Sequence, residues 1–276
     1  MTDAAANLAT HAGEEPPLLM ERRGAIVQLT LNRPKARNAL SHALLTVLGE
    51  RLSEIAADTT VQVVVMDHAP PVFSAGHDLR ELNAHRSDAD DGRGFYEQVM
   101  RKCAEVMQQI VHLPQPVIAA VSGTATAAGC QLVASCDLAV AAEEAKFATP
   151  GVNIGLFCST PMVALSRNVS RKHAMEMLLT GEMIDAHQAA QYGLVNRVVA
   201  ADRVQETAFE LAEKIAAKSP AVVAIGKEAF YRQAEMPLSQ AYDYAAGVMV
   251  ANMMEPDAEE GIGAFLQKRK PEWKGR

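Results

Sequence analysis

The sequence lacks the features of several common protein classes. Its formal net charge is −7 over 276 residues. This argues against a nucleic-acid-binding protein, because neutralising phosphates requires a surplus of Lys and Arg. Its four cysteines include no Cys-x-x-Cys pair, so we expect neither a metal site nor a disulfide framework. No apolar run reaches the length of a membrane span.

The N-terminal segment, residues 1–19, lacks the features of a targeting peptide. It has no basic stretch followed by an apolar one, as a secretion signal would. It contains acidic residues but no arginine, unlike a mitochondrial transit peptide. We therefore expect a disordered leader on a cytoplasmic protein with reduced cysteines.

The motifs of common cofactor enzymes and hydrolases are also missing. The chain contains no Gly-x-x-x-x-Gly-Lys phosphate loop, no His-Glu-x-x-His zinc motif and no Gly-x-Ser-x-Gly elbow. The glycines of segment 123–129 have the wrong spacing for dinucleotide binding.

Short apolar runs alternate with helical patterns over residues 20–200, which predicts an α/β core. Strands are expected at 25–31, 61–67, 116–122, 138–141 and 195–199, and helices at 41–57 and 94–111. Asp185, with Gln188 three positions later, predicts a capping box that opens a further helix. The acidic segment 85–94 is expected to be a mobile loop.

After about residue 200 the strand patterns stop. Four helical stretches follow, at 203–218, 221–234, 238–254 and 257–268. Pro220, Pro237 and Pro256 separate them, at positions where proline starts a helix. The segment 201–276 is rich in Ala and Met and has little to build a core of its own. We therefore expect it to pack on the body or on another subunit.

Two small-residue turns carry the candidate chemistry. Residues 73–79 (FSAGHDL) and 122–131 (SGTATAAGCQ) each follow a buried strand and lead into a helix. Each places free backbone N–H groups and the positive end of a helix dipole beside a strand end, which favours negatively charged oxygen. Taken singly, such a segment is more often only a strand-to-helix turn. Two that converge would form an oxyanion hole, worth a few kcal/mol per donor.

Several segments, in order along the chain, resemble the enoyl-CoA hydratase/isomerase, or crotonase, superfamily. They are 32–40 (NRPKARNAL), 73–79, 116–123 (PVIAAVSG), 127–137 (AAGCQLVASCD), 178–195 (LLTGEMIDAHQAAQYGLV) and the closing AFLQKRKPEWKGR. The resemblance implies a spiral of ββα units over 20–200 and a helical region at 201–276 that forms a trimer or a dimer of trimers. It also implies binding of an acyl-CoA thioester, with no cofactor beyond coenzyme A itself.

The resemblance assigns the two oxyanion donors to the N–H groups of His77 and Ala128. Alanines at 127 and 128 replace glycines of the family, and we expect their methyl groups to be tolerated at negative φ. Asp78 is expected to cap the helix that follows it. The substrate-binding positions implied by the same comparison are Ala36, Ala75, Gly76, Asp78, Leu79 and Ala127.

Two glutamates that serve hydration in this family have no counterpart. Gln131 and Gly151 stand at their positions. An amide transfers no proton near neutral pH, and glycine has no side chain. The turn 155–160, where some isomerases and dehalogenases of the family carry an acid, has none either. We therefore expect altered rather than standard hydratase chemistry.

Three functions stay open. They are a lyase, isomerase or hydratase-like enzyme with altered chemistry, a malonyl-type CoA decarboxylase, and a non-catalytic acyl-CoA binder. Gly-His-Asp at 76–78 is similar to the turn of a methylmalonyl-CoA decarboxylase, but our preferred interpretation directs the His77 imidazole to solvent. Gln131, on the helical face of Ala128, is expected to point at the thioester. Further candidates for the pocket are Asn153, Cys158 and Ser159.

Overall fold

The computed structural model describes residues 15–275 and is built on a six-stranded sheet. The strands lie in the order β1-β2-β3-β5-β7-β10. Their bounds are β1 (Leu18–Arg23), β2 (Ile26–Leu31), β3 (Val63–His68), β5 (Val117–Val121), β7 (Leu138–Ala142) and β10 (Arg197–Val199). Only β1 and β2 pair antiparallel, and all other neighbours are parallel. The continuous apolar runs of β3 and β5 are buried, as expected for strands covered on both faces.

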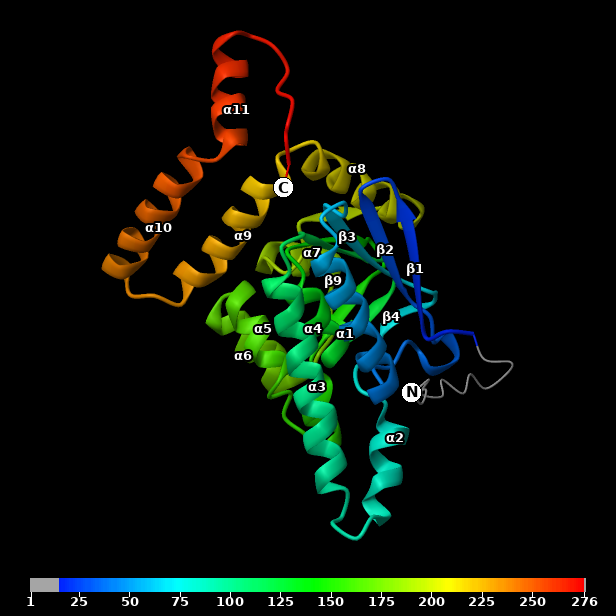
Figure 1. Ribbon diagram of the computed structural model, residues 1–276. Coiled ribbons are helices and arrows are strands. Elements are labelled where there is room, and N and C mark those ends of the chain that lie inside the picture. The colour runs from blue at the N-terminus through cyan, green and yellow to red at the C-terminus, as the bar shows by residue number, and fades with distance from the viewer. Residues whose placement is uncertain (1–14, 276) are drawn as a thin grey trace, which may run out of the picture.

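A smaller sheet contains the second strand of each of three ββα units. It contains β4 (Val72–Ser74), β6 (Thr124–Thr126), β8 (Lys146–Ala148) and β9 (Ile184–Asp185), in that order. The pairs β3–β4, β5–β6 and β7–β8 each send their first strand to the large sheet and their second strand to the small one. A helix follows each pair, which matches the expected spiral of ββα units (Figure 1).

Helices cover the sheets and form the C-terminal region. They are α1 (His42–Ala57), α2 (Leu79–Ala84), α3 (Arg93–His112), α4 (Ala128–Ser135), α5 (Pro161–Asn168), α6 (Arg171–Thr180), α7 (Ala186–Tyr192), α8 (Val204–Ala216), α9 (Pro220–Ala234), α10 (Leu238–Met253) and α11 (Pro256–Leu266). The predicted capping box of Asp185 and Gln188 is present at the start of α7. Pro220 and Pro256 begin helices, as predicted. Among residues 15–275, no helix combines the length and apolar composition needed to cross a membrane.

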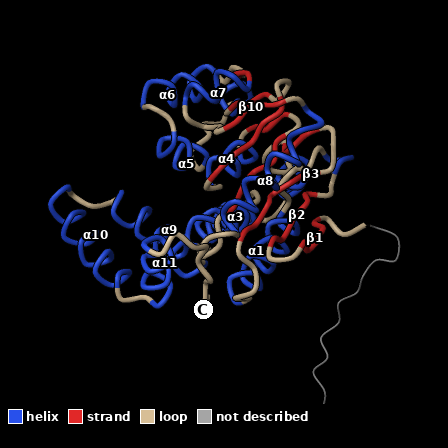
Figure 2. Tube along the Cα trace, turned by 90° about the horizontal axis from the view of Figure 1, so that it is seen from above, coloured by secondary structure: helices blue, strands red, loops and turns tan. Residues whose placement is uncertain are grey.

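Helices α9–α11, here called the C-terminal arm, project away from the body (Figures 1 and 2). A buried lysine ties the arm to the body. Lys227 of α9 donates to the Asp137 carboxylate at 2.6 Å and to the carbonyls of Ile110 and Gln115 at 3.0 and 3.1 Å. The Tyr231 hydroxyl donates to the other oxygen of Asp137 at 2.9 Å.

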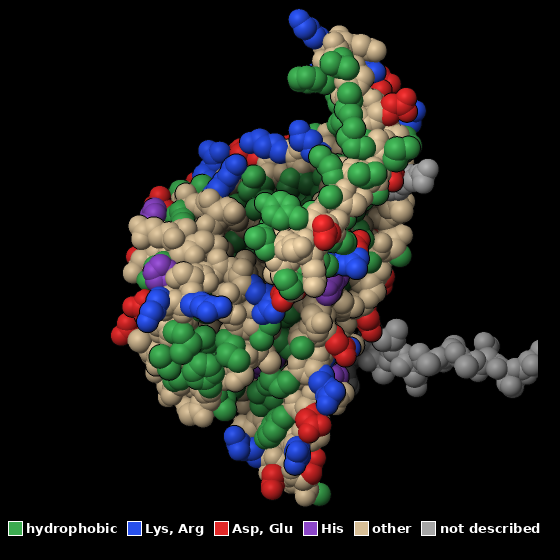
Figure 3. Space-filling model, turned by 90° about the vertical axis from the view of Figure 1, so that its left-hand side faces the viewer, with side chains coloured by type: hydrophobic (Ala, Val, Ile, Leu, Met, Phe, Trp, Pro, Cys, Tyr) green, Lys and Arg blue, Asp and Glu red, His purple; other side chains and the backbone are tan. Residues whose placement is uncertain are grey.

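The outer part of the arm carries exposed apolar side chains (Figure 3). Phe265 is 82% exposed, Met254 81% and Leu238 75%. Apolar patches of this kind mark interaction surfaces more often than free ones. The arm therefore buries little of its own apolar surface in a single chain.

Two expectations from the sequence were wrong. The leader 1–19 extends too far, because Leu18 and Leu19 pair with β2 in strand β1; its residues 1–14 lie outside the described part. The segment 85–94 is an ordered turn rather than a mobile loop: the His85 ring stacks on Phe95 with 3.6 Å between centroids. The Asp90 carboxylate accepts hydrogen bonds from the N–H groups of Gly92 and Gly94, so α3 already begins at Arg93.

Candidate functional site

The two small-residue turns lie in contact with each other. Residues 75–78 connect β4 to α2, and Ala127 connects β6 to α4. A Cβ atom placed on Gly76 would lie 2.8 Å from the Ala127 Cβ and 3.1 Å from the Ala128 nitrogen. Glycine at position 76 therefore lets the backbones of the two turns meet at van der Waals distance, and Gly76 also has a φ of +88° that favours glycine.

Both predicted donors, the N–H groups of His77 and Ala128, are free of partners. Neither group donates a hydrogen bond to another residue between 15 and 275. Ala128 is the first residue of α4, so its N–H has no helical acceptor. The neighbouring Ala127 N–H is engaged, because it donates to the Ala148 carbonyl at 2.9 Å. Two unsatisfied donors thus stand on adjoining turns.

The backbone at Ala127 differs from expectation. Its φ is +50° and its ψ is −120°, a region that an L-residue rarely adopts. The methyl group is therefore held at positive φ rather than negative, at a cost of about 1–3 kcal/mol. This conformation turns the chain sharply into α4, of which Ala128 is the first residue. Alanine at this position gives no sequence signal of positive φ.

The segment that contains Ala36 runs beside the His77 turn. The Ala75 N–H donates to the Arg37 carbonyl at 3.0 Å, and the Leu40 N–H donates to the Gly76 carbonyl at 2.8 Å. Ala36 is half-buried and Leu79 is exposed. The structure therefore brings the predicted substrate-binding positions of the first turn into one region.

Asp78 fixes the start of α2, as predicted. Its carboxylate accepts from the N–H groups of Arg80 and Glu81 at 3.2 and 3.4 Å. It also pairs with Arg33 at 3.0 Å. These hydrogen bonds and the Arg33 charge outweigh the effect of burial and lower the pKa of Asp78. Asp78 is thus a charged structural group that joins the turn to the segment of Ala36.

His77 is half-buried, but both nitrogens of its imidazole are closed to solvent, so our expectation that the imidazole points to solvent was wrong. Both ring nitrogens are inaccessible and have no hydrogen-bond partner among residues 15–275. Burial lowers the pKa of His77, and the nearby Leu40 backbone raises it by less, although neither ring nitrogen reaches hydrogen-bond geometry with that backbone. A neutral imidazole carries one donor and one acceptor. Leaving both unpaired in a buried place is costly, which is a feature of sites completed by a ligand.

Gln131 and Gly151 approach the second turn from different elements. Gln131 is buried in the first turns of α4, and its side-chain oxygen lies 4.0 Å from the Cys103 sulfur. Gly151 lies in the short 3₁₀ helix Pro150–Ile154, which follows β8. Cys158 is buried beside it, whereas Asn153 and Ser159 are exposed. Of the three further pocket candidates, only Cys158 is enclosed.

The sequence did not single out Thr149. Its side chain is only 1% exposed, and its hydroxyl has no partner in the described part of the chain. It directly precedes Pro150 and Gly151 and follows the carbonyl that holds Ala127. A threonine before a proline gives no signal of a buried free hydroxyl.

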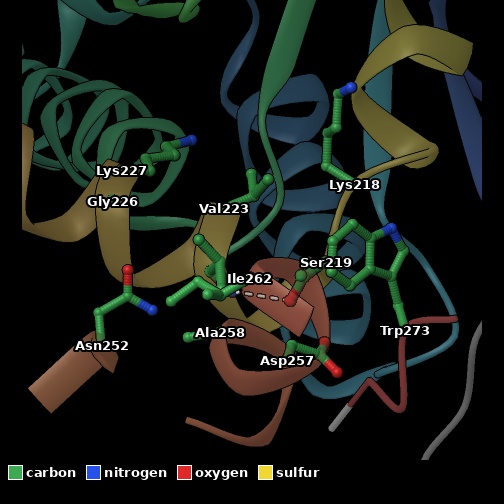
Figure 4. A pocket seen from close by; sticks show the side chains of 12 residues that line it. Lys218, Ser219, Val223, Gly226, Lys227, Asn252, Asp257, Ala258, Ile262 and Trp273 are labelled. Carbon is green, nitrogen blue, oxygen red and sulfur yellow. Dashed lines mark hydrogen bonds between the residues drawn. The ribbon is translucent and has the colours of Figure 1, made fainter. Parts of the chain in front are cut away.

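A separate cavity of about 530 Å³ lies at the base of the C-terminal arm (Figure 4). Trp273, Asp257 and Ser219 line one end, and Asn252 and Lys227 line the other. None of the predicted site residues lines it. Over residues 15–275 there is also no group of three or more His, Cys, Asp or Glu side chains that could hold a metal ion.

Comparison with known proteins identifies the family. The family model described as enoyl-CoA hydratase/isomerase matches residues 21–276. The chain belongs to the enoyl-CoA hydratase/isomerase family. Relatives of this family include the mitochondrial enoyl-CoA hydratase domain-containing protein 3 of Rattus norvegicus, 48% identical over 94% of this chain and 85% of the relative. The 2,3-dehydroadipyl-CoA hydratase of Escherichia coli is 37% identical over 94% of this chain and 99% of the relative.

Solved structures show the same crotonase fold. An enoyl-CoA hydratase from Mycobacterium smegmatis is 53% identical, with a TM-score of 0.89 over 94% of this chain and 99% of that chain. Human enoyl-CoA hydratase domain-containing protein 3 is 47% identical, with a TM-score of 0.89 over 94% of this chain and 100% of that chain. The rat and human relatives are named as mitochondrial proteins, so the expected cytoplasmic location is not confirmed.

Proposed function

We propose that this protein binds an acyl-CoA thioester and polarises its carbonyl between the N–H groups of His77 and Ala128. The observation that carries the proposal is the contact of the two turns, with both N–H groups free of hydrogen-bond partners among residues 15–275. Donors held in place before the substrate arrives stabilise an enolate or a tetrahedral oxyanion without reorganisation. Membership of the enoyl-CoA hydratase/isomerase family supports a thioester as the ligand.

The chemistry at this site is altered from that of a hydratase. Hydration requires one group that takes a proton from water and one that delivers a proton to the α-carbon. Gln131 provides an amide, and Gly151 provides no side chain. Burial raises the pKa of Cys158, so its neutral thiol does not replace a carboxylate. We assign the site to thioester reactions that depend on stabilising an enolate, with coenzyme A as the only cofactor and as part of the substrate.

A second candidate is a decarboxylase for malonyl-type CoA thioesters. The observation that favours it is the buried His77 ring, with both nitrogens unpaired. In such a reaction the bond from the α-carbon to the carboxylate breaks, and its electrons form the enolate held in the hole. The α-carbon then takes a proton from water. The His77 ring nitrogens are closed to solvent in the structure, so this role requires the side chain to turn toward the hole, where a neutral imidazole can donate a hydrogen bond to the departing carboxylate.

A panel of ligands tests both candidates and the third, a non-catalytic binder. Coenzyme A, butyryl-CoA, crotonyl-CoA, malonyl-CoA and methylmalonyl-CoA are each titrated by calorimetry and assayed for turnover. We expect butyryl-CoA to bind more tightly than coenzyme A, and crotonyl-CoA to be hydrated slowly or not at all. Equal affinity for coenzyme A and butyryl-CoA would contradict the proposed hole. Tight binding without any turnover would identify a non-catalytic binder, and rapid hydration of crotonyl-CoA would contradict altered chemistry.

The variant His77→Gln separates the two roles of residue 77. It keeps the backbone N–H and removes the ring. If the protein is a decarboxylase, turnover of malonyl-CoA falls by at least tenfold while affinity for butyryl-CoA is retained. An unchanged decarboxylation rate would remove the ring from the mechanism.

We also propose that the protein assembles as a homotrimer or a dimer of trimers through the C-terminal arm. The exposed apolar side chains of α10 and α11 support this, because a free chain leaves them in water. Sedimentation equilibrium measures the mass directly. A monomer at micromolar concentration would contradict the assembly.

A further inference from the structure

Cys158 occupies the space beside Gly151. A Cβ atom placed on Gly151 would lie 2.8 Å from the Cys158 sulfur and 2.8 Å from the Leu156 carbonyl oxygen. Both distances are shorter than non-bonded atoms tolerate. The chain folds back over Gly151, and the Cys158 thiol fills the space that a side chain at position 151 would occupy.

The backbone holds this arrangement in place. The Leu156 N–H donates to the Gly151 carbonyl at 2.9 Å, and the reversal passes through Gly155 at a φ of +77°. Leu156 and Phe157 are 53% and 43% exposed, whereas Cys158 is only 8% exposed. The Met162 N–H then donates to the Cys158 carbonyl at 2.9 Å as α5 begins. One small side chain is thus turned inward from a segment whose larger apolar neighbours face outward.

The thiol lies on the side of the site formed by α4. The Ala148 carbonyl that accepts from Ala127 is three residues before Gly151, so the 3₁₀ helix begins at the second turn. Cys130, in the first turn of α4, is close enough to Cys158 that a charge on one thiol raises the pKa of the other. Cys158 therefore lies near the first turn of α4.

We propose that Cys158 determines which acyl groups the site accepts, by forming the wall that a side chain at position 151 would otherwise form. This inference rests on the proposed acyl-CoA site. A buried thiol is apolar and polarisable, so it packs against alkyl groups and holds water poorly. The acyl carbons next to the thioester then lie against sulfur in a dry pocket of fixed size. The ligand class is a short acyl-CoA whose α-carbon carries hydrogen or one small substituent.

Changing the size of residue 158 tests the inference. Coenzyme A, butyryl-CoA and 2-methylbutyryl-CoA are titrated by calorimetry into the wild-type protein and into Cys158→Ala and Cys158→Val. We expect Cys158→Ala to improve the affinity for 2-methylbutyryl-CoA relative to butyryl-CoA by about tenfold, since one methylene in a fitted pocket changes discrimination by at least this factor. Cys158→Val should weaken the binding of both acyl-CoAs relative to the binding of coenzyme A. If the valine variant does not fold, the alanine variant alone decides.

Cys136→Ala is the matched control. Cys136 is a free cysteine, 6% exposed, and lies at the opposite end of α4 from Ala128. Cys136→Ala also removes one buried thiol from the core, as Cys158→Ala does. It should leave the ratio of the two acyl-CoA affinities unchanged. The inference is overturned if Cys158→Ala leaves this ratio unchanged, or if Cys136→Ala changes it equally. Failure of the proposed function is distinguishable, because wild-type protein would then bind butyryl-CoA no better than coenzyme A.

Discussion

The contact of the two turns predicts a specific energetic coupling between residues 76 and 127. Gly76→Ala places a methyl group 2.8 Å from the Ala127 Cβ, and it does so at a φ of +88°. Positive φ costs an L-residue about 1–2 kcal/mol, and an added methyl in a filled space costs about 1–3 kcal/mol. We therefore expect Gly76→Ala to lower the free energy of unfolding by about 2–5 kcal/mol.

The second substitution, Ala127→Gly, removes the other methyl of the collision. It also relieves the positive φ at 127, worth about 1–3 kcal/mol, against about 0.5–1 kcal/mol for the greater freedom of glycine in the unfolded chain. Alone it should stabilise the protein by about 1 kcal/mol. In the double variant the cost of Gly76→Ala should be smaller by about 1–2 kcal/mol, because the two methyl groups no longer meet.

Urea denaturation of the wild-type protein, the two single variants and the double variant, all at the same protein concentration, measures this double-mutant cycle. Gly76→Ala should also weaken butyryl-CoA binding while leaving coenzyme A binding unchanged, since the wedge separates the His77 and Ala128 donors. A coupling energy below about 0.5 kcal/mol would refute the contact, because independent sites add within that margin.

Other contacts give further predictions. Gly129→Ala should lower the free energy of unfolding by about 1–3 kcal/mol, because a Cβ atom at this position would collide with the Ser74 carbonyl oxygen of β4. The control is Gly263→Ala, where a Cβ atom meets nothing within 4 Å. In the same urea assay this control should be neutral or stabilising. Lys227→Met should cost about 3–5 kcal/mol by leaving the Asp137 carboxylate without its buried partner, and adding Asp137→Asn should recover part of it; additive losses would contradict the pairing. Because the pKa of His77 is lowered in the folded protein, the unfolded chain binds more protons than the folded one at pH values between that lowered pKa and about 6.5. The contribution of neutral His77 to stability is therefore complete above about pH 6.5 and is lost as the pH falls below that value. His77→Gln should flatten the pH dependence of unfolding over that range, and an unchanged slope would exclude the buried ring as its source.

The sequence predicted the elements whose signals are local. The apolar runs of β3 and β5 and the capping box of Asp185 were located correctly, because periodicity and capping depend on a few adjacent residues. The strands β4, β6, β8 and β9 were missed, since each has three residues or fewer and depends on pairing with distant segments.

The candidate site shows the same division. The two turns were found from their small residues and their place after buried strands. The positive φ of Ala127 and the buried ring of His77 were not, because tertiary contacts impose both. The filling of the Gly151 position by Cys158 depends on a chain reversal across seven residues, for which the sequence carries no periodic signal.

The carbonyl stretching frequency of a bound thioester tests the central claim most directly. Butyryl-CoA labelled with ¹³C at the thioester carbonyl is bound to the wild-type protein, and the isotope difference spectrum is recorded in the infrared. Two N–H donors from His77 and Ala128 should move the stretch to lower frequency than in water, and Gly76→Ala should reverse much of the shift. A bound thioester whose carbonyl absorbs at its frequency in water would contradict the account.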